Sequence, residues 1–262
     1  MKETARANAN IALVKYWGNR DKKLILPYNS SISMTLDKLF TTTTVEFSEK
    51  YRKNELWMNG QKILGIEAER AFGLVDLVRK KAKLSSKAKI ASNNSFPTSA
   101  GLASSASGFA ALVLSASKAA GLDLSQRELS MLARMGSGSA ARSIHGGFVE
   151  WKKGSKSDGS DCYGEQIAKK EHWPGLRMLV AIVSTKKKKV GSRAGMDLTV
   201  KTSPMYDSWL ATIDNDLKDM KEGILKRDFK KAALTAQLNC LKMHAAMITT
   251  KPPIIYWQPE TI

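Results

Sequence analysis

Small residues and hydroxyls crowd the stretch 97–112, PTSAGLASSASGFAAL, at the expected start of an amphipathic helix. The first turn of a helix offers unpaired N–H groups and the positive end of the helix dipole, and both favour anions. Gly101 lets a ligand approach the backbone closely, and Ser104, Ser105 and Ser107 add hydroxyls for phosphate or Mg²⁺. The same composition also suits tight helix packing, so the residues alone leave a phosphate site and a packing role both open.

A second glycine- and serine-rich turn, Ser137-Gly138-Ser139, is followed one turn later by Arg142. An arginine in this place can bind a carboxylate or a phosphate through two parallel hydrogen bonds. The alternative is a serine N-cap with an arginine at the surface. The two commonest nucleotide signatures, GxxxxGK[ST] and GxGxxG, are absent from the sequence.

Lys15 stands at the end of a predicted strand, between the apolar Val14 and the aromatic pair Tyr16-Trp17. A lysine in such surroundings either extends its ammonium group to water at the strand edge or is a cation held in a site. Both interpretations fit the residues.

Alternation and helical periodicity predict the elements that position these residues. A two-residue Asn59-Gly60 turn predicts a hairpin over 56–63, and a capping box at Ser125 opens a helix over 126–135. Further strands are expected over 10–17, 41–48, 88–95, 147–151 and 176–184, and further helices over 67–82 and 102–120. The chain after 184 is helical by period. A composition shift near residue 175 predicts two domains, 1–175 and 176–262.

The chain has 262 residues, of which 42 are Lys or Arg and 24 are Asp or Glu, so its formal charge is +18. Such a charge attracts polyanions, but no nucleic-acid-binding motif accompanies it, so we expect no nucleic-acid partner. Cys162 and Cys240 lie far apart, and the three histidines form no ligand pattern, which disfavours a disulfide framework or a zinc site. No apolar run reaches the length of a membrane span and no signal peptide is evident, so we expect a cytoplasmic location and no membrane partner.

Five segments are similar, in order and nearly in wording, to mevalonate diphosphate decarboxylases of the GHMP kinase superfamily: NIALVKYWGNRD, PTSAGLASSASGFAAL, GSGSAARSIHGGFVEW, GSRAGM and MHAAMITTKPPIIYW. The resemblance implies an α/β fold of two lobes: an ATP-binding lobe like domain 2 of ribosomal protein S5 and an incomplete ferredoxin-like C-terminal lobe. It also implies a homodimer. It further implies that ATP and Mg²⁺ phosphorylate the 3-hydroxyl of a phosphorylated mevalonate, after which phosphate and CO₂ leave and isopentenyl diphosphate remains.

The resemblance also implies residue roles. Lys15 is catalytic, and Tyr16 faces the substrate. The substrate loop is formed by Ser137, Gly138, Ser139 and Arg142, where the catalytic Arg142 holds the C1 carboxylate. The segment that closes over the 5-phosphoryl end contains Ser192, Arg193 and Met196. The ATP phosphate loop comprises Pro97, Ser99, Ala100, Gly101, Leu102, Ala103, Ser104 and Ser105, with Ser105 implicated in catalysis or Mg²⁺ binding.

Two departures from the family pattern bear on function. Asn19 stands where the family usually has a lysine near the 5-diphosphate, which leaves a phosphomevalonate decarboxylase or a mevalonate 3-kinase-like enzyme as alternatives. The essential aspartate of the family lies in a motif downstream of KPPIIYW and has no match here. We therefore assign that role to no acid, and we expect the isolated 262-residue chain to have little decarboxylase activity and reduced stability. A non-catalytic basic module that binds nucleic acid or protein is the alternative of another class.

Overall fold

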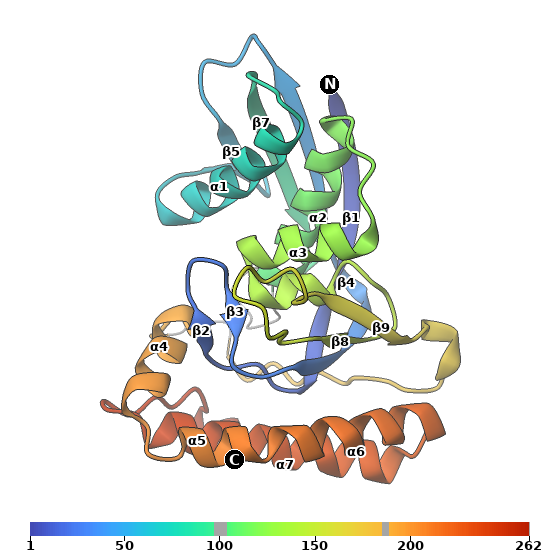
Figure 1. Ribbon diagram of the computed structural model, residues 1–262, viewed down its shortest axis with the longest axis vertical. Coiled ribbons are helices and arrows are strands. Elements are labelled where there is room, and N and C mark those ends of the chain that lie inside the picture. Colours follow the sequence, from blue (N-terminus) through green and yellow to red (C-terminus); the bar gives the residue numbers. More distant parts are fainter. Residues whose placement is uncertain (97–103, 185–188, 262) are drawn as a thin grey trace.

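A computed structural model describes residues 1–96, 104–184 and 189–261 of the chain. Its centre is a mixed sheet with the strand order β6-β5-β7-β4-β8-β9, in which β1 also pairs with β4. Figure 1 shows helices α1 to α3 against the upper part of the sheet and α4 to α7 below it.

Two long strands run through both halves of the sheet. β4 (Ser31–Ser48) pairs with β8 (Phe148–Trp151) through its first half and with β7 (Lys87–Asn94) through its second. β1 (Lys2–Val14) follows β4 along almost its whole length, with the pairing interrupted between Asn8 and Asn10. Pairing stops at Val14 opposite Ile32. The residues directly after β1 are therefore released from the sheet at its lower end.

The shorter strands complete the sheet edges. β5 (Glu55–Met58) and β6 (Gln61–Ile63) form a hairpin, and β5 pairs in parallel with β7. At the other edge β9 (Gly164–Ala168) pairs with β8. β2 (Asn19–Asp21) and β3 (Leu26–Pro27) form a separate two-stranded sheet.

An apolar core lies between the upper sheet and the helices α1 (Ile66–Lys81), α2 (Ser104–Ala119) and α3 (Gln126–Gly136). The α2 helix contributes mostly alanines, for example Ala110 and Ala116, to this core. Their small side chains let α2 approach β1 and β4 closely, since no larger side chain separates the backbones. The same small residues therefore serve packing along most of the helix.

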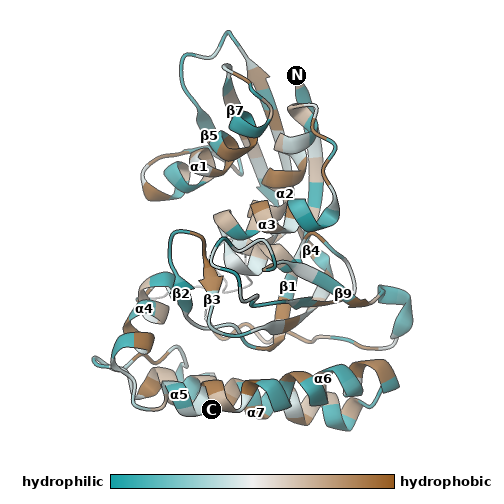
Figure 2. Cartoon of the chain, in the orientation of Figure 1, coloured by the Kyte–Doolittle hydropathy of each residue, from teal (hydrophilic) through white to brown (hydrophobic). Residues whose placement is uncertain are grey.

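A second core joins the lower ends of the strands to the C-terminal helices α4 (Ser192–Thr202), α5 (Tyr206–Ala211), α6 (Ile213–Lys226) and α7 (Phe229–Ile248). Val14 and Ile32 from the strands and Met220 and Met247 from the helices are fully buried in it. Figure 2 shows apolar and polar segments alternating along α6 and α7. None of the described helices has the length and apolar character that crossing a membrane demands.

Most predicted elements are confirmed. The Asn59-Gly60 hairpin, the helix over 67–82 and the capping box at Ser125 are all present. The expected strand over 10–17 begins earlier, at Lys2, and ends at Val14. β9 forms where the sequence predicted no element.

The expected strand over 176–184 is wrong. Its described residues form no regular element, and Leu179 is 95% exposed. A continuous apolar run has strand propensity, but a strand also needs a neighbour to accept and donate its backbone hydrogen bonds. No described strand pairs with this segment.

Candidate functional site

The end of β1 delivers Lys15 to the junction between the sheet and the C-terminal helices. Its backbone N–H donates to Asn239 Oδ1 at 2.8 Å, its carbonyl accepts from Asn29 Nδ2 at 2.8 Å, and its Nζ donates to Ala12 O at 2.9 Å. Burial lowers the pKa of Lys15, and the Arg142 charge lowers it further, while Cys240 opposes the shift. The structure thus holds a partly desolvated cation here.

Arg142 ends the short 3-10 helix η1 (Gly138–Arg142) and is 3% exposed. Its Nη1 donates to Ser31 Oγ at 2.6 Å and its Nε to Asn10 Oδ1 at 3.3 Å. Burial lowers the pKa of Arg142 to about 10. No carboxylate among the described residues forms an ion pair with this guanidinium. A buried cation with only neutral partners is suited to receive an anionic ligand.

Tyr16 and Gly138 meet at the ring of Trp151. The Tyr16 and Trp151 ring centroids lie 4.7 Å apart with an edge-on angle of 78°. A Cβ at position 138 would lie 2.6 Å from the Trp151 ring and 3.0 Å from Tyr16, so only glycine fits there. Burial raises the pKa of Tyr16, and its hydroxyl donates to Asn19 Oδ1 at 2.5 Å. Tyr16 is therefore a neutral hydrogen-bond donor beside Arg142.

The first residues of α2 reach the turn that precedes η1. Ser137 Oγ donates to Ser105 Oγ at 3.4 Å and lies 3.2 Å from Ser139 Oγ. Three hydroxyls from two distant parts of the sequence therefore form a continuous polar line. The remaining predicted members of the phosphate loop lie outside the described residues: Pro97, Ser99, Ala100, Gly101, Leu102 and Ala103.

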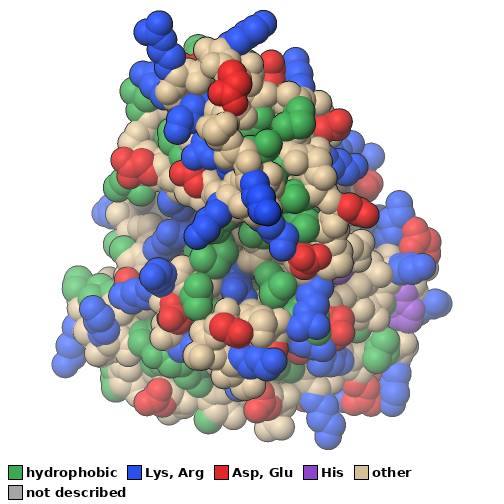
Figure 3. Space-filling view, turned by 45° about the horizontal axis from the view of Figure 1, so that its top comes forward, with side chains coloured by type: hydrophobic (Ala, Val, Ile, Leu, Met, Phe, Trp, Pro, Cys, Tyr) green, Lys and Arg blue, Asp and Glu red, His purple; other side chains and the backbone are tan. Residues whose placement is uncertain are grey.

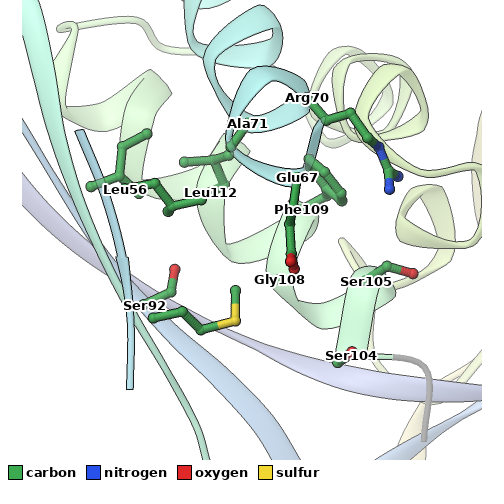
Figure 4. A pocket seen from close by; sticks show the side chains of 12 residues that line it. Leu56, Glu67, Arg70, Ala71, Ser92, Ser104, Ser105, Gly108, Phe109 and Leu112 are labelled. Atoms are coloured by element: carbon green, nitrogen blue, oxygen red, sulfur yellow. The ribbon is translucent and has the colours of Figure 1, made fainter. Parts of the chain in front are cut away.

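A pocket opens between α1 and the start of α2. In Figure 4 Leu56, Ala71 and Leu112 gather at one end of it, and Arg70 and Ser105 lie at the other. An apolar recess with a few polar groups at one end is the usual form of a small-molecule site. The full lining consists of Leu56, Met58, Glu67, Arg70, Ala71, Ile90, Ser92, Ser104, Ser105, Gly108, Phe109 and Leu112.

Two arginines from different helical groups converge on one carbonyl. Arg70 Nη2 of α1 donates to Gly136 O at 2.8 Å, and Arg193 Nη2 of α4 donates to the same oxygen at 3.0 Å. Burial, aided by the Arg193 charge, lowers the pKa of Arg70 to about 10. The sequence pattern identified Arg193 but missed Arg70, because an arginine on an amphipathic helix is typical of a solvated face. Only the tertiary structure shows that Arg70 faces the pocket.

The three predicted residues of α4 are placed differently. Arg193 donates to the carbonyl of Gly136, the residue directly before the predicted substrate loop. Ser192 is the exposed first residue of the helix, and Met196 is buried in the second core near Trp17. Met196 therefore packs the base of this segment.

The described residues offer Mg²⁺ a few hydroxyl oxygens rather than a set of carboxylate ligands. Among residues 1–96, 104–184 and 189–261 no group of three His, Cys, Asp or Glu side chains could hold a metal ion. Mg²⁺ keeps several waters and is commonly bound by substrate phosphates with only one or two protein groups. The oxygens of Ser105, Ser137 and Ser139 fit such a limited role.

Comparisons with known proteins identify the family. The model of the diphosphomevalonate decarboxylase-like N-terminal domain matches residues 7–164, and that of the mevalonate 5-diphosphate decarboxylase C-terminal domain matches 178–260. The diphosphomevalonate decarboxylase of Candida albicans is 45% identical over 264 residues, which cover 95% of this chain and 73% of the relative. The human diphosphomevalonate decarboxylase is 40% identical over 269 residues, covering 97% of this chain and 66% of the relative.

Solved structures agree with this match. MDDEF in complex with MVAPP, AMPPCP and magnesium superposes with a TM-score of 0.93 at 42% identity, covering 99% of this chain and 79% of the other. Mevalonate diphosphate decarboxylase from Staphylococcus aureus superposes with a TM-score of 0.92 at 43% identity, and the match covers 99% of this chain and 78% of the other. The fold and site thus define an α/β protein with the GHMP kinase fold. Within that class, the chain belongs to the diphosphomevalonate decarboxylase family.

Proposed function

We propose that the site of this chain serves the ATP-dependent decarboxylation of mevalonate 5-diphosphate to isopentenyl diphosphate, phosphate and CO₂. The observation that carries the proposal is the 3.4 Å contact between Ser105, at the pocket, and Ser137, at the head of the substrate loop. A phosphoryl donor in the pocket and an acceptor beside Arg142 would meet along this hydroxyl line. Relatives that share the family name and the fold support the same reaction.

The reaction needs a cation for the substrate carboxylate and a donor site for the phosphoryl group. The tertiary hydroxide of the substrate is a poor leaving group, whereas phosphate is a good one. When the 3-phosphate leaves, the C1–C2 bond electrons form the C2–C3 double bond and C1 departs as CO₂. In this proposal Arg142 holds the C1 carboxylate through its spare N–H groups, and Lys15 adds a second cation at the same end.

The pocket between α1 and α2 is the proposed site for ATP. Its apolar end suits a purine ring, and Arg70 with the hydroxyls of Ser104 and Ser105 suits the phosphates. Mg²⁺, when bound, neutralises phosphate charge during transfer. Ser105, Ser137 and Ser139 orient oxygen atoms toward the place where donor and acceptor meet. The related MDDEF was solved in complex with AMPPCP and magnesium, which supports ATP and Mg²⁺ as the cofactors.

The 5-phosphoryl end lies, in this proposal, near Arg193 and Asn19. A neutral amide that accepts a hydrogen bond from Tyr16 occupies position 19. The family pattern has a lysine there, so the site has one cation fewer for a diphosphate. This observation favours the 5-monophosphate as a second candidate substrate. A kinase that stops after 3-phosphorylation would release ADP without CO₂.

A non-catalytic nucleic-acid module is less consistent with the surface. Figure 3 shows Lys and Arg spread over the visible face with acidic side chains among them. Several lysines pair with carboxylates, as Lys221 does with Glu150 at 2.8 Å. A basic patch for a nucleic acid would be continuous.

We further propose a boundary near residue 175 between two lobes, a homodimeric assembly and a cytoplasmic location. In this proposal the C-terminal lobe is an incomplete ferredoxin-like lobe. Size-exclusion chromatography with light scattering tests the dimer, and a monomer mass at all concentrations would contradict it.

The proposed reaction is tested with mevalonate 5-diphosphate and mevalonate 5-phosphate, each labelled at C1. ATP-dependent release of labelled CO₂ supports decarboxylation, and the ratio of the two kcat/KM values selects the substrate. Equilibrium binding of each ligand, measured by calorimetry, separates recognition from turnover. No binding of either mevalonate ester would contradict the proposal.

A further inference from the structure

The backbone of Lys15 is fixed by a side chain from the C-terminal helices. Lys15 is the first residue beyond β1, so its N–H has no strand partner and donates instead to Asn239 Oδ1 at 2.8 Å. Asn239 lies on α7 and is fully buried. A buried amide side chain can hold the backbone of another element in place only if the orientation of the amide is itself fixed.

A second contact fixes that orientation. Asn239 Nδ2 donates to Asp216 Oδ2 of α6 at 2.8 Å, which leaves Oδ1 to face Lys15. Lys242 Nζ donates to both Asp216 oxygens, at 2.7 and 2.8 Å, and to Thr212 Oγ1 at 2.9 Å. The amide therefore has one satisfied orientation, set by an ion pair on the far side.

We propose that Asn239 is a positioning residue for the Lys15 ammonium group, acting through the Lys15 backbone and oriented by Asp216. These hydrogen bonds connect α6 and α7 to the end of β1. The C-terminal helices therefore fix the position of a cation that directly follows a strand of the N-terminal sheet. Lys15 meets the substrate only if the proposed function holds. The placement of Lys15 by Asn239 does not depend on it.

The charged and titratable groups around Lys15 determine how a substitution at Asn239 would change the Lys15 pKa. Arg142 lies on the η1 side and Cys240 on the α7 side, and burial is the largest influence on the Lys15 pKa. Loss of the amide frees the segment after β1, so the ammonium group gains water and its pKa rises toward that of an ordinary lysine.

The test compares Asn239→Leu with Thr235→Val. Thr235 is a buried polar residue on the same helix whose hydroxyl donates only within α7, to Lys231 O at 2.8 Å. Both variants remove a buried polar group, but only the first removes the contact to Lys15. Lysines are labelled by reductive ¹³C-methylation, and the Lys15 resonance is assigned by its loss in Lys15→Arg.

We expect the Lys15 amine to titrate at higher pH in Asn239→Leu and as in the wild type in Thr235→Val. We also expect the dissociation constant for mevalonate 5-diphosphate to rise about tenfold to hundredfold in the first variant only, because small displacements of a binding group are costly. An unchanged Lys15 titration in a folded Asn239→Leu protein would overturn the proposal. A wild type that binds no mevalonate 5-diphosphate would instead contradict the proposed function.

An exchanged pair keeps the test informative if Asn239→Leu does not fold. Asn239→Asp alone places two carboxylates next to each other and should weaken ligand binding. The double variant Asn239→Asp with Asp216→Asn restores one donor and one acceptor between the helices, so binding should recover. Failure of the double variant to recover, despite a native circular dichroism spectrum, would count against the hydrogen-bonded route.

Discussion

Ser105 and Ser137 touch hydroxyl to hydroxyl at 3.4 Å although 32 residues separate them in the chain. The first lies in the first turn of α2 beside the pocket, and the second precedes η1, which carries Arg142. Their contact makes the proposed donor and acceptor sites neighbours. Substitutions on either side of this contact should therefore affect one shared reaction.

Arg142→Gln should reduce turnover by about a hundredfold or more, because a buried cation aimed at a reacting anion is worth roughly that much. The glutamine keeps hydrogen-bonding capacity toward Ser31 but removes the charge. Arg127→Gln is the matched control, since that arginine is exposed and donates to Ser160 O. Steady-state release of labelled CO₂ measures both. Equal losses in the two variants would refute the role of Arg142.

Gly138→Ala should lower the free energy of unfolding by about 1–3 kcal/mol, the usual cost of overpacking. The added Cβ meets the Trp151 ring, so Tyr16 and η1 must shift and substrate affinity should fall as well. Urea denaturation and calorimetry measure the two effects. Gly73→Ala, in α1, meets no atom within 4 Å and should stabilise the protein by about 0.5–1 kcal/mol.

Asn19→Lys should increase affinity for mevalonate 5-diphosphate more than for the 5-monophosphate, because it adds a cation near Tyr16. Asn19→Gln is the neutral control. Calorimetric titration of each variant with both ligands gives the comparison. A wild type that already strongly prefers the diphosphate, and a lysine variant that changes nothing, would remove any importance from position 19.

Substrate affinity should fall as the pH rises through the Lys15 pKa, since the neutral amine no longer attracts an anion. Burial lowers that pKa, so the fall begins at lower pH than for an ordinary lysine. Lys15→Arg keeps the charge and should make the affinity less dependent on pH. The wild-type and variant dissociation constants, followed from about pH 7 to about pH 10, test this. Parallel profiles would show that Lys15 does not titrate in the site.

Arg70→Met should raise the dissociation constant of an ATP analogue about tenfold, because it removes a charged hydrogen-bond donor from the pocket and the contact to Gly136 O. Lys80→Met removes an exposed charge from the same helix and serves as the control. Fluorescence titration with a labelled nucleotide measures both. A loss of the same size in both variants would indicate that only the overall charge matters.

The sequence predicted correctly those elements that depend only on residues close together in the chain. The Asn59-Gly60 turn and the Ser125 capping box depend on residues within four positions, so the sequence alone specifies them. The apolar run over 176–184 has no such local signal, because a strand depends on a partner elsewhere in the chain. The wrong prediction there reflects this non-local requirement.

The same distinction applies to the site. The residue types of Lys15 and Arg142 and the glycine- and serine-rich turns made anion binding one of two interpretations from the residues alone, and the resemblance to a family favoured it. Arg70 and Asn239 gave no signal, since each sits on a helix with ordinary periodicity and acts through a contact made in three dimensions. Residues that act through distant partners can be found only from the fold.

The central claim is that the neighbouring pocket and substrate loop support phosphorylation followed by decarboxylation. The most direct measurement incubates the protein with mevalonate 5-diphosphate labelled at C1, ATP and Mg²⁺, and follows labelled CO₂ together with ADP. We predict that one CO₂ is released for each ADP formed and that Arg142→Gln lowers the rate of both by about a hundredfold or more. ADP formation without CO₂, or CO₂ release that does not require ATP, would contradict the account.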